Sequence, residues 1–252
     1  MEKINILGIK ISNTSLEELL KDVKSILAGS ESRYIVTPNP EIVLLSHKDS
    51  ELFYILNRAD IAIPDGTGLQ LAALLMGSVI NRITGSSLTP ELLKLAETSG
   101  EKVIVIIWNG GLSTKDETIR SISRIYPKLD FKVIACGKKV YEDATAYQEL
   151  LNEAVKFGPA IVFAGLGAPH QEKLVYRLCR DLDGIRLGVG IGGTIDFLTG
   201  KIKRAPFIFR KIGIEWLWRL KEQVMLKGEP ASLKLERLKR IYNAVFVFSW
   251  KF

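Results

Sequence analysis

The most regular stretch of the sequence is residues 160–172, which read Ala160-Ile161-Val162-Phe163-Ala164-Gly165-Leu166-Gly167-Ala168-Pro169-His170-Gln171-Glu172. Its first five residues are all apolar, as in a strand that is buried on both faces. Two glycines follow, and an amphipathic helical pattern then runs over residues 171–180. A strand, a short glycine loop and a helix in this order are the repeating unit of a parallel sheet.

The same alternation of apolar runs and amphipathic stretches continues on both sides of this segment. The strand candidates are residues 4–11, 34–36, 61–63, 103–107, 132–136, 160–164 and 186–189. The helix candidates are residues 16–27, 41–47, 69–75, 91–96, 116–126, 144–156 and 171–180. This order predicts an α/β fold over residues 1–200, with a mostly parallel, Rossmann-like sheet and helices on both of its faces.

Polar residues and glycines follow several of the predicted strands directly. They are Thr37 and Asn39, Asp65, Gly165 and Gly167, and Gly190. Ligands of open parallel sheets bind outside the carboxyl ends of the strands, so these residues are expected to meet at one rim. There Asp65 could act as a general base, Thr37 and Asn39 could bind sugar hydroxyls, and the glycines could let backbone amides approach a diphosphate.

Each of these motifs also has a purely structural interpretation. Asp65 could be a turn residue that caps the helix beginning near Thr67. Thr37 and Asn39 could form a turn leading into the helix after Pro40. The glycines could simply make tight turns, since neither loop matches the full G-x-G-x-x-G pattern.

Basic residues are concentrated in the last fifth of the chain. Residues 201–252 carry 13 Lys/Arg against 4 Asp/Glu, a net of +9, which leaves 22 against 24, a net of −2, for residues 1–200. Aromatic residues such as Trp216 and Trp250 lie among these basic residues. The pattern predicts a helical, amphipathic appendage that meets an anionic membrane surface, and it argues against a nucleic-acid-binding protein, whose charge would be spread over the domain.

The remaining composition predicts neither a metal site nor a resident cofactor. Cys136, Cys179, His47 and His170 are far apart and lack metal-binding spacing. Asp181-Leu182-Asp183 spells the D-x-D of many metal-dependent transferases, but it lies between a helix and a strand at the opposite rim. The first residues lack the features of a signal peptide, and no apolar stretch reaches about 20 residues, so a cytoplasmic protein is expected.

The motifs together resemble the WecG/TagA/CpsF family of bacterial glycosyltransferases. The resemblance runs from about residue 36 to 219. It is carried by Thr37-Pro38-Asn39, Pro64-Asp65-Gly66-x-Gly68, Arg82-x-x-Gly85, Gly165-x-Gly167-x-Pro169-x-Gln171-Glu172, Gly188-Val189-Gly190, Asp196-Phe197, Gly200, Arg204-Ala205-Pro206 and Gly213-x-Glu215-Trp216-Leu217-x-Arg219-Leu220. Two departures stand out: Ser86-Ser87-Leu88 replaces the aspartate usual after Arg-x-x-Gly, and Glu229-Pro230 comes late.

The resemblance implies a metal-independent, inverting transferase on the inner face of the cell membrane. It implies transfer of N-acetylmannosamine from its UDP donor to undecaprenyl-diphosphate-linked N-acetylglucosamine, the linkage step of wall teichoic acid. The alternative donors are the UDP-linked uronic acid of this sugar or a UDP-hexose. Residues 201–252 would close the site and contact the membrane, and self-association is expected, with apolar residues 69–76 as a candidate subunit contact.

The resemblance also assigns roles to individual residues. Asp65 is implied as the catalytic base, with Thr37 beside it as a catalytic group. The residues expected to bind substrate are Asn39, Arg82, Gly165, Gly167, Gln171, Glu172, Gly190, Asp196, Arg204, Arg219, Arg237 and Arg240. Two rival functions share part of this pattern: a dinucleotide-dependent oxidoreductase, and a peripheral membrane module that binds UDP-sugars or polyprenyl phosphates without catalysis.

Overall fold

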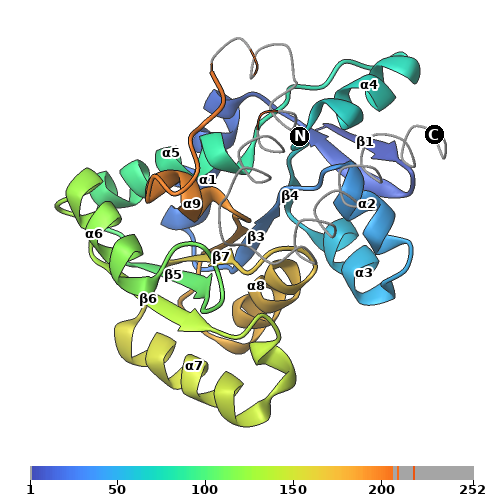
Figure 1. The fold of residues 1–252 in the computed structure, drawn as a ribbon. Helices are drawn as coiled ribbons and strands as arrows, with labels where there is room; N and C mark the ends of the chain where they lie inside the picture. The colour runs from blue at the N-terminus through green and yellow to red at the C-terminus, as the bar shows by residue number, and fades with distance from the viewer. Residues whose placement is uncertain (1, 207–208, 210–217, 219–252) are drawn as a thin grey trace.

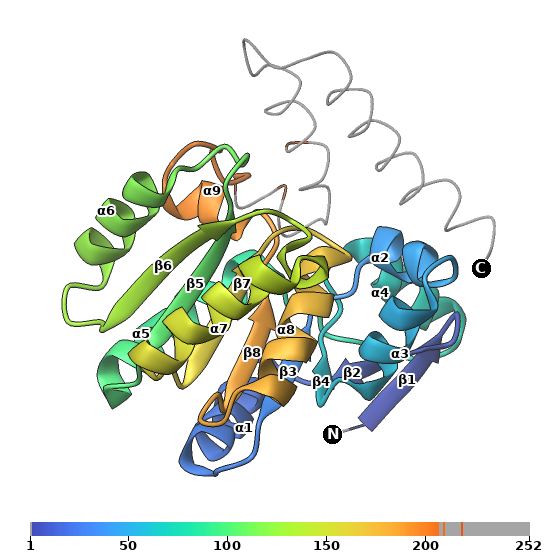
Figure 2. The same ribbon diagram turned by 90° about the horizontal axis from the view of Figure 1, so that it is seen from below.

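The structure, a computed structural model, describes residues 2–206, 209 and 218. Its centre is a six-stranded sheet in the order β4-β3-β8-β7-β5-β6, in which all five neighbouring pairs are parallel. Helices cover both faces of this sheet (Figures 1 and 2). The predicted fold class is therefore confirmed, whereas most of the predicted appendage, from residue 207 on, lies outside the described residues apart from Phe209 and Trp218.

The strands and helices alternate along the chain as the sequence predicts. The strands are β1 (Glu2–Ile6), β2 (Ile9–Asn13), β3 (Arg33–Val36), β4 (Ile61–Ala62), β5 (Val103–Trp108), β6 (Phe131–Cys136), β7 (Ile161–Gly165) and β8 (Leu187–Gly190). The helices are α1 (Leu16–Ala28), α2 (Pro40–Ser46), α3 (Ser50–Arg58), α4 (Thr67–Leu75), α5 (Gly85–Ser99), α6 (Lys115–Ile125), α7 (Ala144–Phe157), α8 (His170–Asp181) and α9 (Thr194–Leu198), with a short 3₁₀ turn, η1 (Val140–Glu142).

Each face of the sheet has its own apolar core. Along β5, Ile104 and Ile106 belong to the core beneath α2, α3, α7 and α8, while Val103 and Val105 belong to the core beneath α1, α5, α6 and α9. Successive residues of a strand point to opposite faces. A strand covered on both faces must therefore be apolar at every position, which explains the unbroken run in β5.

The N-terminal segment differs from the prediction. Residues 4–11 were expected to form one strand, but the chain turns at Leu7 and Gly8, which have φ values of 48° and 80°. Strands β1 and β2 consequently pair antiparallel as a separate two-stranded sheet. A two-residue turn with positive φ at both positions matches the twist of a hairpin, and the glycine is the sequence signal for it.

Three helices also differ from the prediction. Helix α3 was not predicted, although Asp49 caps it by accepting a hydrogen bond from the Leu52 N–H. Helix α5 begins six residues before the expected start at Glu91, because Thr84 forms a capping box with Ser87 and Pro90 is accommodated within the helix. Helix α9 was not among the predicted helices.

An apolar surface lies on α4 and the residues after it. Leu69, Ala72 and Ala73 are buried, but Leu71, Leu74, Leu75 and Met76 are half-exposed or more, and Val79 is 77% exposed. The predicted stretch 69–76 is thus partly core and partly surface, and the predicted subunit contact there stays a prediction. None of the helices within residues 2–206 has both the length and the apolar character needed to cross a bilayer.

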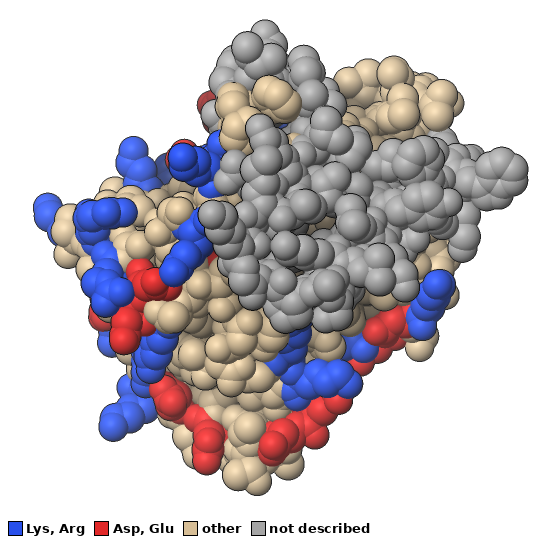
Figure 3. All heavy atoms as spheres, viewed as in Figure 1, with Lys and Arg blue, Asp and Glu red and all other residues tan. Residues whose placement is uncertain are grey.

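The charges on the described surface are of mixed sign. Figure 3 shows Lys/Arg and Asp/Glu side chains next to one another on the face that it presents. Ion pairs between described residues include Lys173 with Asp49 at 2.7 Å and Lys132 with Glu153 at 2.8 Å. This mixture agrees with the near-neutral charge of residues 1–200.

Packing of α8 on the sheet depends on a glycine in β8. A Cβ atom on Gly188 would lie 2.6 Å from both Cys179 Sγ and Val175 Cγ1 of α8. We expect Gly188→Ala to force the helix outward and to lower the free energy of unfolding by about 1–3 kcal/mol, the usual cost of overpacking. Urea unfolding would measure this. The matched control is Gly137→Ala, whose Cβ would meet no atom within 4 Å; equal losses in both variants would contradict the packing argument.

Candidate active site

The loops that follow β3, β4, β7 and β8 meet at the carboxyl ends of the strands. The Asp65 N–H donates to Pro38 O at 2.8 Å and joins the loops after β3 and β4. The Ile191 N–H donates to Ala164 O at 2.9 Å and joins the loop after β8 to the end of β7. Neighbouring parallel strands place these loops side by side, so the convergence predicted from the sequence is observed.

The Asp65 carboxylate is held by a helix that begins 20 residues later. Its Oδ2 accepts a hydrogen bond of 3.1 Å from the N–H of Gly85, the first residue of α5. Backbone N–H groups at a helix N-terminus attract negative charge, so this contact both orients and stabilises the carboxylate. The N-cap residue of α4 is Gly66 and not Asp65, while the alternative interpretation of Asp65 as a turn residue before this helix stays a prediction.

The end of a third strand, β8, also comes close to Asp65, next to Gly85. A Cβ atom placed on Gly85 would lie 3.8 Å from Asp65 Oδ2, 3.8 Å from Thr194 Oγ1 and 3.7 Å from Ile191 O. The loop after β8 and the start of α5 are therefore both next to the carboxylate. Arg82 precedes this helix, and the neighbouring Ile83 N–H donates to Pro64 O at 3.2 Å.

Thr37 and Asn39 form the side of the site that follows β3. The buried Thr37 hydroxyl donates to Gly190 O over 3.4 Å, which links β3 to the end of β8. Asn39 is the N-cap of α2, since its Oδ1 accepts from the Ile42 N–H at 2.9 Å. The structural interpretation of Asn39 is thus confirmed, and any contact of Thr37 or Asn39 with a sugar stays a prediction.

Gln171 lies between the two glycine loops and holds them together. Its Oε1 accepts hydrogen bonds from Gly167 N at 3.1 Å and from Gly192 N at 2.9 Å. These two amides therefore point at a protein side chain. Gly165 permits close contact between the loops, because a Cβ there would lie 3.1 Å from Gly192 O.

Glu172 is a carboxylate buried behind this rim. Its side chain is 1% exposed, its Oε1 accepts from Gln171 Nε2 at 2.8 Å, and its Oε2 has no hydrogen-bond partner within the described structure. Burial raises the pKa of this carboxyl to about 7 against the opposing effect of the Gln171 hydrogen bond, and the negative charge of Glu41 adds to the rise. A direct contact of Glu172 with substrate, as the sequence suggested, would require the buried side chain to become accessible.

Two further predicted residues lie next to the rim. Arg204 Nη2 contacts the buried Ser86 Oγ at 3.5 Å, which places a guanidinium beside the first turn of α5. Asp196 of α9 accepts a hydrogen bond of 2.6 Å from Ser113, a residue in the loop after β5. Arg219, Arg237 and Arg240 lie outside the described residues.

Sequence reasoning did not identify Ser113. Its hydroxyl contacts both Asp196 and Thr199 Oγ1, at 2.6 and 2.7 Å. The available signal was its position after a predicted strand, in the sequence Trp108-Asn109-Gly110-Gly111-Leu112-Ser113. Since every strand in this sheet delivers its following loop to the same rim, the loop after β5 belonged with the others.

The structure also places the residues that were considered for metal binding. Asp181 is the last residue of α8, at the rim opposite the site, and its Oδ2 accepts from the Tyr147 hydroxyl at 2.9 Å. Within the described residues there is no group of three His, Cys, Asp or Glu side chains that could hold a metal ion. Cys136 and Cys179 are both free thiols.

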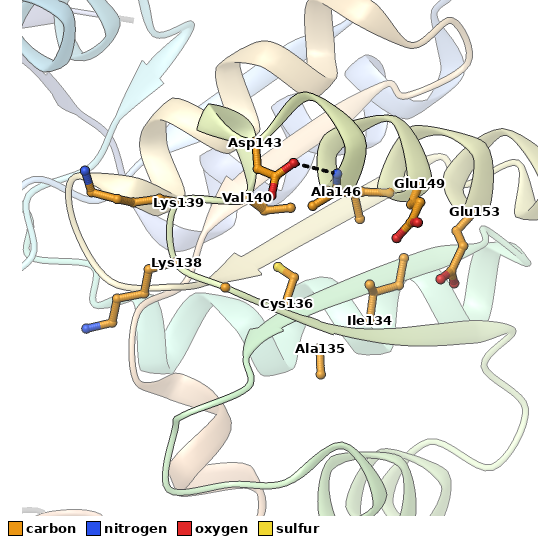
Figure 4. A pocket seen from close by; sticks show the side chains of 12 residues that line it. Ile134, Ala135, Cys136, Lys138, Lys139, Val140, Asp143, Ala146, Glu149 and Glu153 are labelled. Atoms are coloured by element: carbon orange, nitrogen blue, oxygen red, sulfur yellow. Dashed lines mark hydrogen bonds between the residues drawn. The ribbon is translucent and has the colours of Figure 1, made fainter.

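A groove of about 610 Å³ lies at the edge of the sheet, between the edge strand β6 and helix α7. Figure 4 shows side chains such as Cys136, Lys138, Asp143 and Glu149 around it. None of the predicted site residues lines this groove. The candidate site is therefore the converging loops, not this groove.

A carboxylate held beside glycine loops at the carboxyl rim of a parallel sheet is typical of the ligand-binding site of an α/β protein. A sequence profile of the glycosyl transferase WecG/TagA/CpsF family matches residues 4–224. The chain belongs to this family and is a glycosyltransferase. Both rival functions, the oxidoreductase and the module without catalysis, are thereby excluded.

Two named relatives are similar to most of the chain. Proteins of Staphylococcus aureus strains MRSA252 and NCTC 8325 / PS 47 are each 30% identical over 221 residues, which cover 86% of this chain and 84% of theirs. Each is named N-acetylglucosaminyldiphosphoundecaprenol N-acetyl-beta-D-mannosaminyltransferase.

The buried Glu172 gives stability a specific pH dependence. Its pKa lies near 4.5 in the unfolded chain and rises to about 7 in the folded protein, so between these values the folded state binds more protons. The free energy of unfolding therefore falls as pH rises through this window, by up to about 3 kcal/mol at 1.36 kcal/mol per pKa unit. Glu172→Gln removes this titration and should gain stability relative to wild type as pH rises from 4 to 8. Urea unfolding at several pH values tests this, and parallel curves for the two proteins would contradict it.

Proposed function

We propose that the protein transfers N-acetylmannosamine from UDP-N-acetylmannosamine to undecaprenyl-diphosphate-linked N-acetylglucosamine, as in the linkage unit of wall teichoic acid. The names of the Staphylococcus aureus relatives support the transferred sugar and the lipid-linked acceptor. The position of Asp65 on the rim carries the mechanism, since a carboxylate there is held ready to accept a proton. The runner-up is a UDP-linked uronic acid or hexose as donor to the same kind of acceptor.

In the proposed reaction Asp65 is the general base. It takes the proton of the acceptor hydroxyl as the oxygen attacks the anomeric carbon from the face opposite UDP, and the sugar configuration inverts. The Gly85 N–H restricts the orientation of the carboxylate, so one oxygen is fixed while the proton is transferred. Thr37 lies next to the same loops and would bind the reacting sugar.

Cationic side chains stabilise the departing diphosphate in this proposal. Arg204 lies beside the first turn of α5, where the helix N-terminus adds its own attraction for negative charge. Arg82 precedes the same helix. The other arginines of residues 201–252, called the tail below, complete this set of cationic side chains. A guanidinium binds two phosphate oxygens at once, so the reaction is proposed to need no metal ion.

The proposal of membrane binding follows from the lipid-linked acceptor and from the charge of the tail. The acceptor named for the relatives carries a polyprenyl chain, and residues 201–252 have a net charge of +9. We therefore propose peripheral binding of the tail to the cytoplasmic leaflet, with the tail closing the site, and a homo-oligomer as an additional state of the protein.

Substitution of Asp65 tests the proposed base. We expect both Asp65→Ala and Asp65→Asn to lower kcat for UDP release by about a hundredfold or more, because an amide can still accept from Gly85 but cannot take the proton. The assay uses UDP-N-acetylmannosamine and a lipid-diphosphate-linked acceptor in the presence of a chelator. Asp181→Asn is the matched control, because Asp181 is the last residue of α8 and lies at the rim opposite the site. Full activity of Asp65→Asn would refute the base, and activity only with another UDP-sugar would correct the donor.

Removal of the tail tests its proposed role. A chain that ends after Pro206 keeps every strand of the sheet but loses ten of the 13 basic residues of positions 201–252. We expect transfer to fall by about a hundredfold or more, the scale for losing charge stabilisation of a leaving group, while circular dichroism still reports a cooperatively unfolding core. Activity equal to that of the full chain would show that the site is complete without the tail.

A further inference from the structure

We propose that Glu172 is a positioning residue, which fixes the side-chain amide of Gln171 so that Gln171 can hold the loops after β7 and β8 in register. This role deepens the proposed function and rests on it, because the loop after β8 borders the Asp65 carboxylate that the mechanism uses. It assigns to Gln171 and Glu172 a task that requires no contact with substrate.

The hydrogen bonds of Gln171 allow only one orientation of its amide. Oε1 accepts from two backbone N–H groups, Gly167 N and Gly192 N, at 3.1 and 2.9 Å. A flipped amide would turn its own NH₂ group toward these two donors, and both hydrogen bonds would be lost. The side chain is 2% exposed, so water is largely excluded as a substitute.

Glu172 supplies the acceptor that this orientation needs. With Oε1 of Gln171 facing the glycines, Nε2 points to Glu172 Oε1 at 2.8 Å. Glu172 Oε1 can accept this hydrogen bond both when the carboxyl is ionised and when its proton is on Oε2, so it favours the amide orientation in which the nitrogen faces it. The second oxygen of Glu172 is buried without a partner in the described structure, a costly arrangement that packing alone does not explain.

The glycines around Gln171 fit the same interpretation. A Cβ on Gly190 would lie 3.1 Å from Gln171 Nε2 and 3.3 Å from its Cγ, so the absence of a side chain gives Gln171 room to cross β8. Gly167 and Gly192 have φ values of 78° and 53°, a backbone region that suits glycine. These conformations let both N–H groups face a single oxygen.

The hydrogen bonds of Gln171 are connected to the proposed catalytic residues through the loop after β8. Gly190 O accepts the Thr37 hydroxyl, and Ile191 O lies against Gly85, whose N–H holds Asp65. Loss of the Gln171 bridge would release Gly192, the next residue along that loop. We therefore expect a positioning defect to change binding of the UDP-sugar more than the rate of the bound complex.

Hydrogen exchange tests the positioning role without any assumption about substrate. In Glu172→Leu the amides of Gly167 and Gly192 should exchange at least about tenfold faster than in wild type, because local opening becomes easier. Glu172→Gln still offers an acceptor oxygen and should restore most of the protection. Glu149→Leu, an exposed carboxylate on α7, is the matched control and should leave both amides unchanged. Unchanged exchange in Glu172→Leu would overturn the proposal.

Kinetics with the full chain give the second readout. We expect Glu172→Leu to raise KM for the UDP-sugar by about tenfold with a smaller change in kcat, and Gln171→Leu/Glu172→Leu to be no worse than Gln171→Leu, since residues in one network are not additive. If the effects of Gln171→Leu and Glu172→Leu on KM multiply in the double variant, the proposal is overturned. It is also overturned if Glu172→Gln raises KM as much as Glu172→Leu does. If UDP-N-acetylmannosamine is not turned over by wild type, the proposed donor fails, and the exchange measurement still decides the role of Glu172.

Discussion

All six strands of the central sheet run in the same direction, and the position of every candidate site residue depends on this alignment. Because the strands are parallel, each one delivers its following loop to the same rim, and residues as distant as Thr37 and Gly190 become neighbours. The alignment requires apolar side chains on both faces, since helices cover each of them. The polar chemistry is consequently confined to the strand ends, where Asp65 lies.

The rim itself is built with groups that a core optimised for stability would not contain. Gly165 and Gly190 have no side chain where a Cβ atom would be crowded by neighbouring atoms. Glu172 has a buried carboxylate oxygen without a partner in the described structure. Each feature costs stability, either through chain entropy or through desolvation. A protein tolerates such costs when they serve the site, which is why Glu172 and the glycines around Gln171 are best explained together.

The parts of the fold that depend on local pattern could be predicted, and the parts that depend on distant partners could not. Residues 103–107 were predicted correctly because every residue is apolar and β-branched. The hairpin at Leu7 and Gly8 was missed because the apolar pattern continues across the turn. Asp65 was predicted as a site residue from its place after a strand. Its partner Gly85, and the pairing of Gln171 with Gly192, depend on contacts about 20 residues apart that no periodicity encodes.

The replacement at Ser86 shows how one such contact changes the electrostatics of the rim. The family resemblance predicts an aspartate where this chain has Ser86, and the buried hydroxyl of Ser86 contacts Arg204 at 3.5 Å. A hydroxyl accepts from a guanidinium without neutralising it, whereas a carboxylate at the same place would form an ion pair. A serine at this place therefore adds no negative charge beside the N-terminus of α5. An arginine and a helix N-terminus both attract anions, so this combination agrees with the proposed binding of the donor diphosphate next to Asp65.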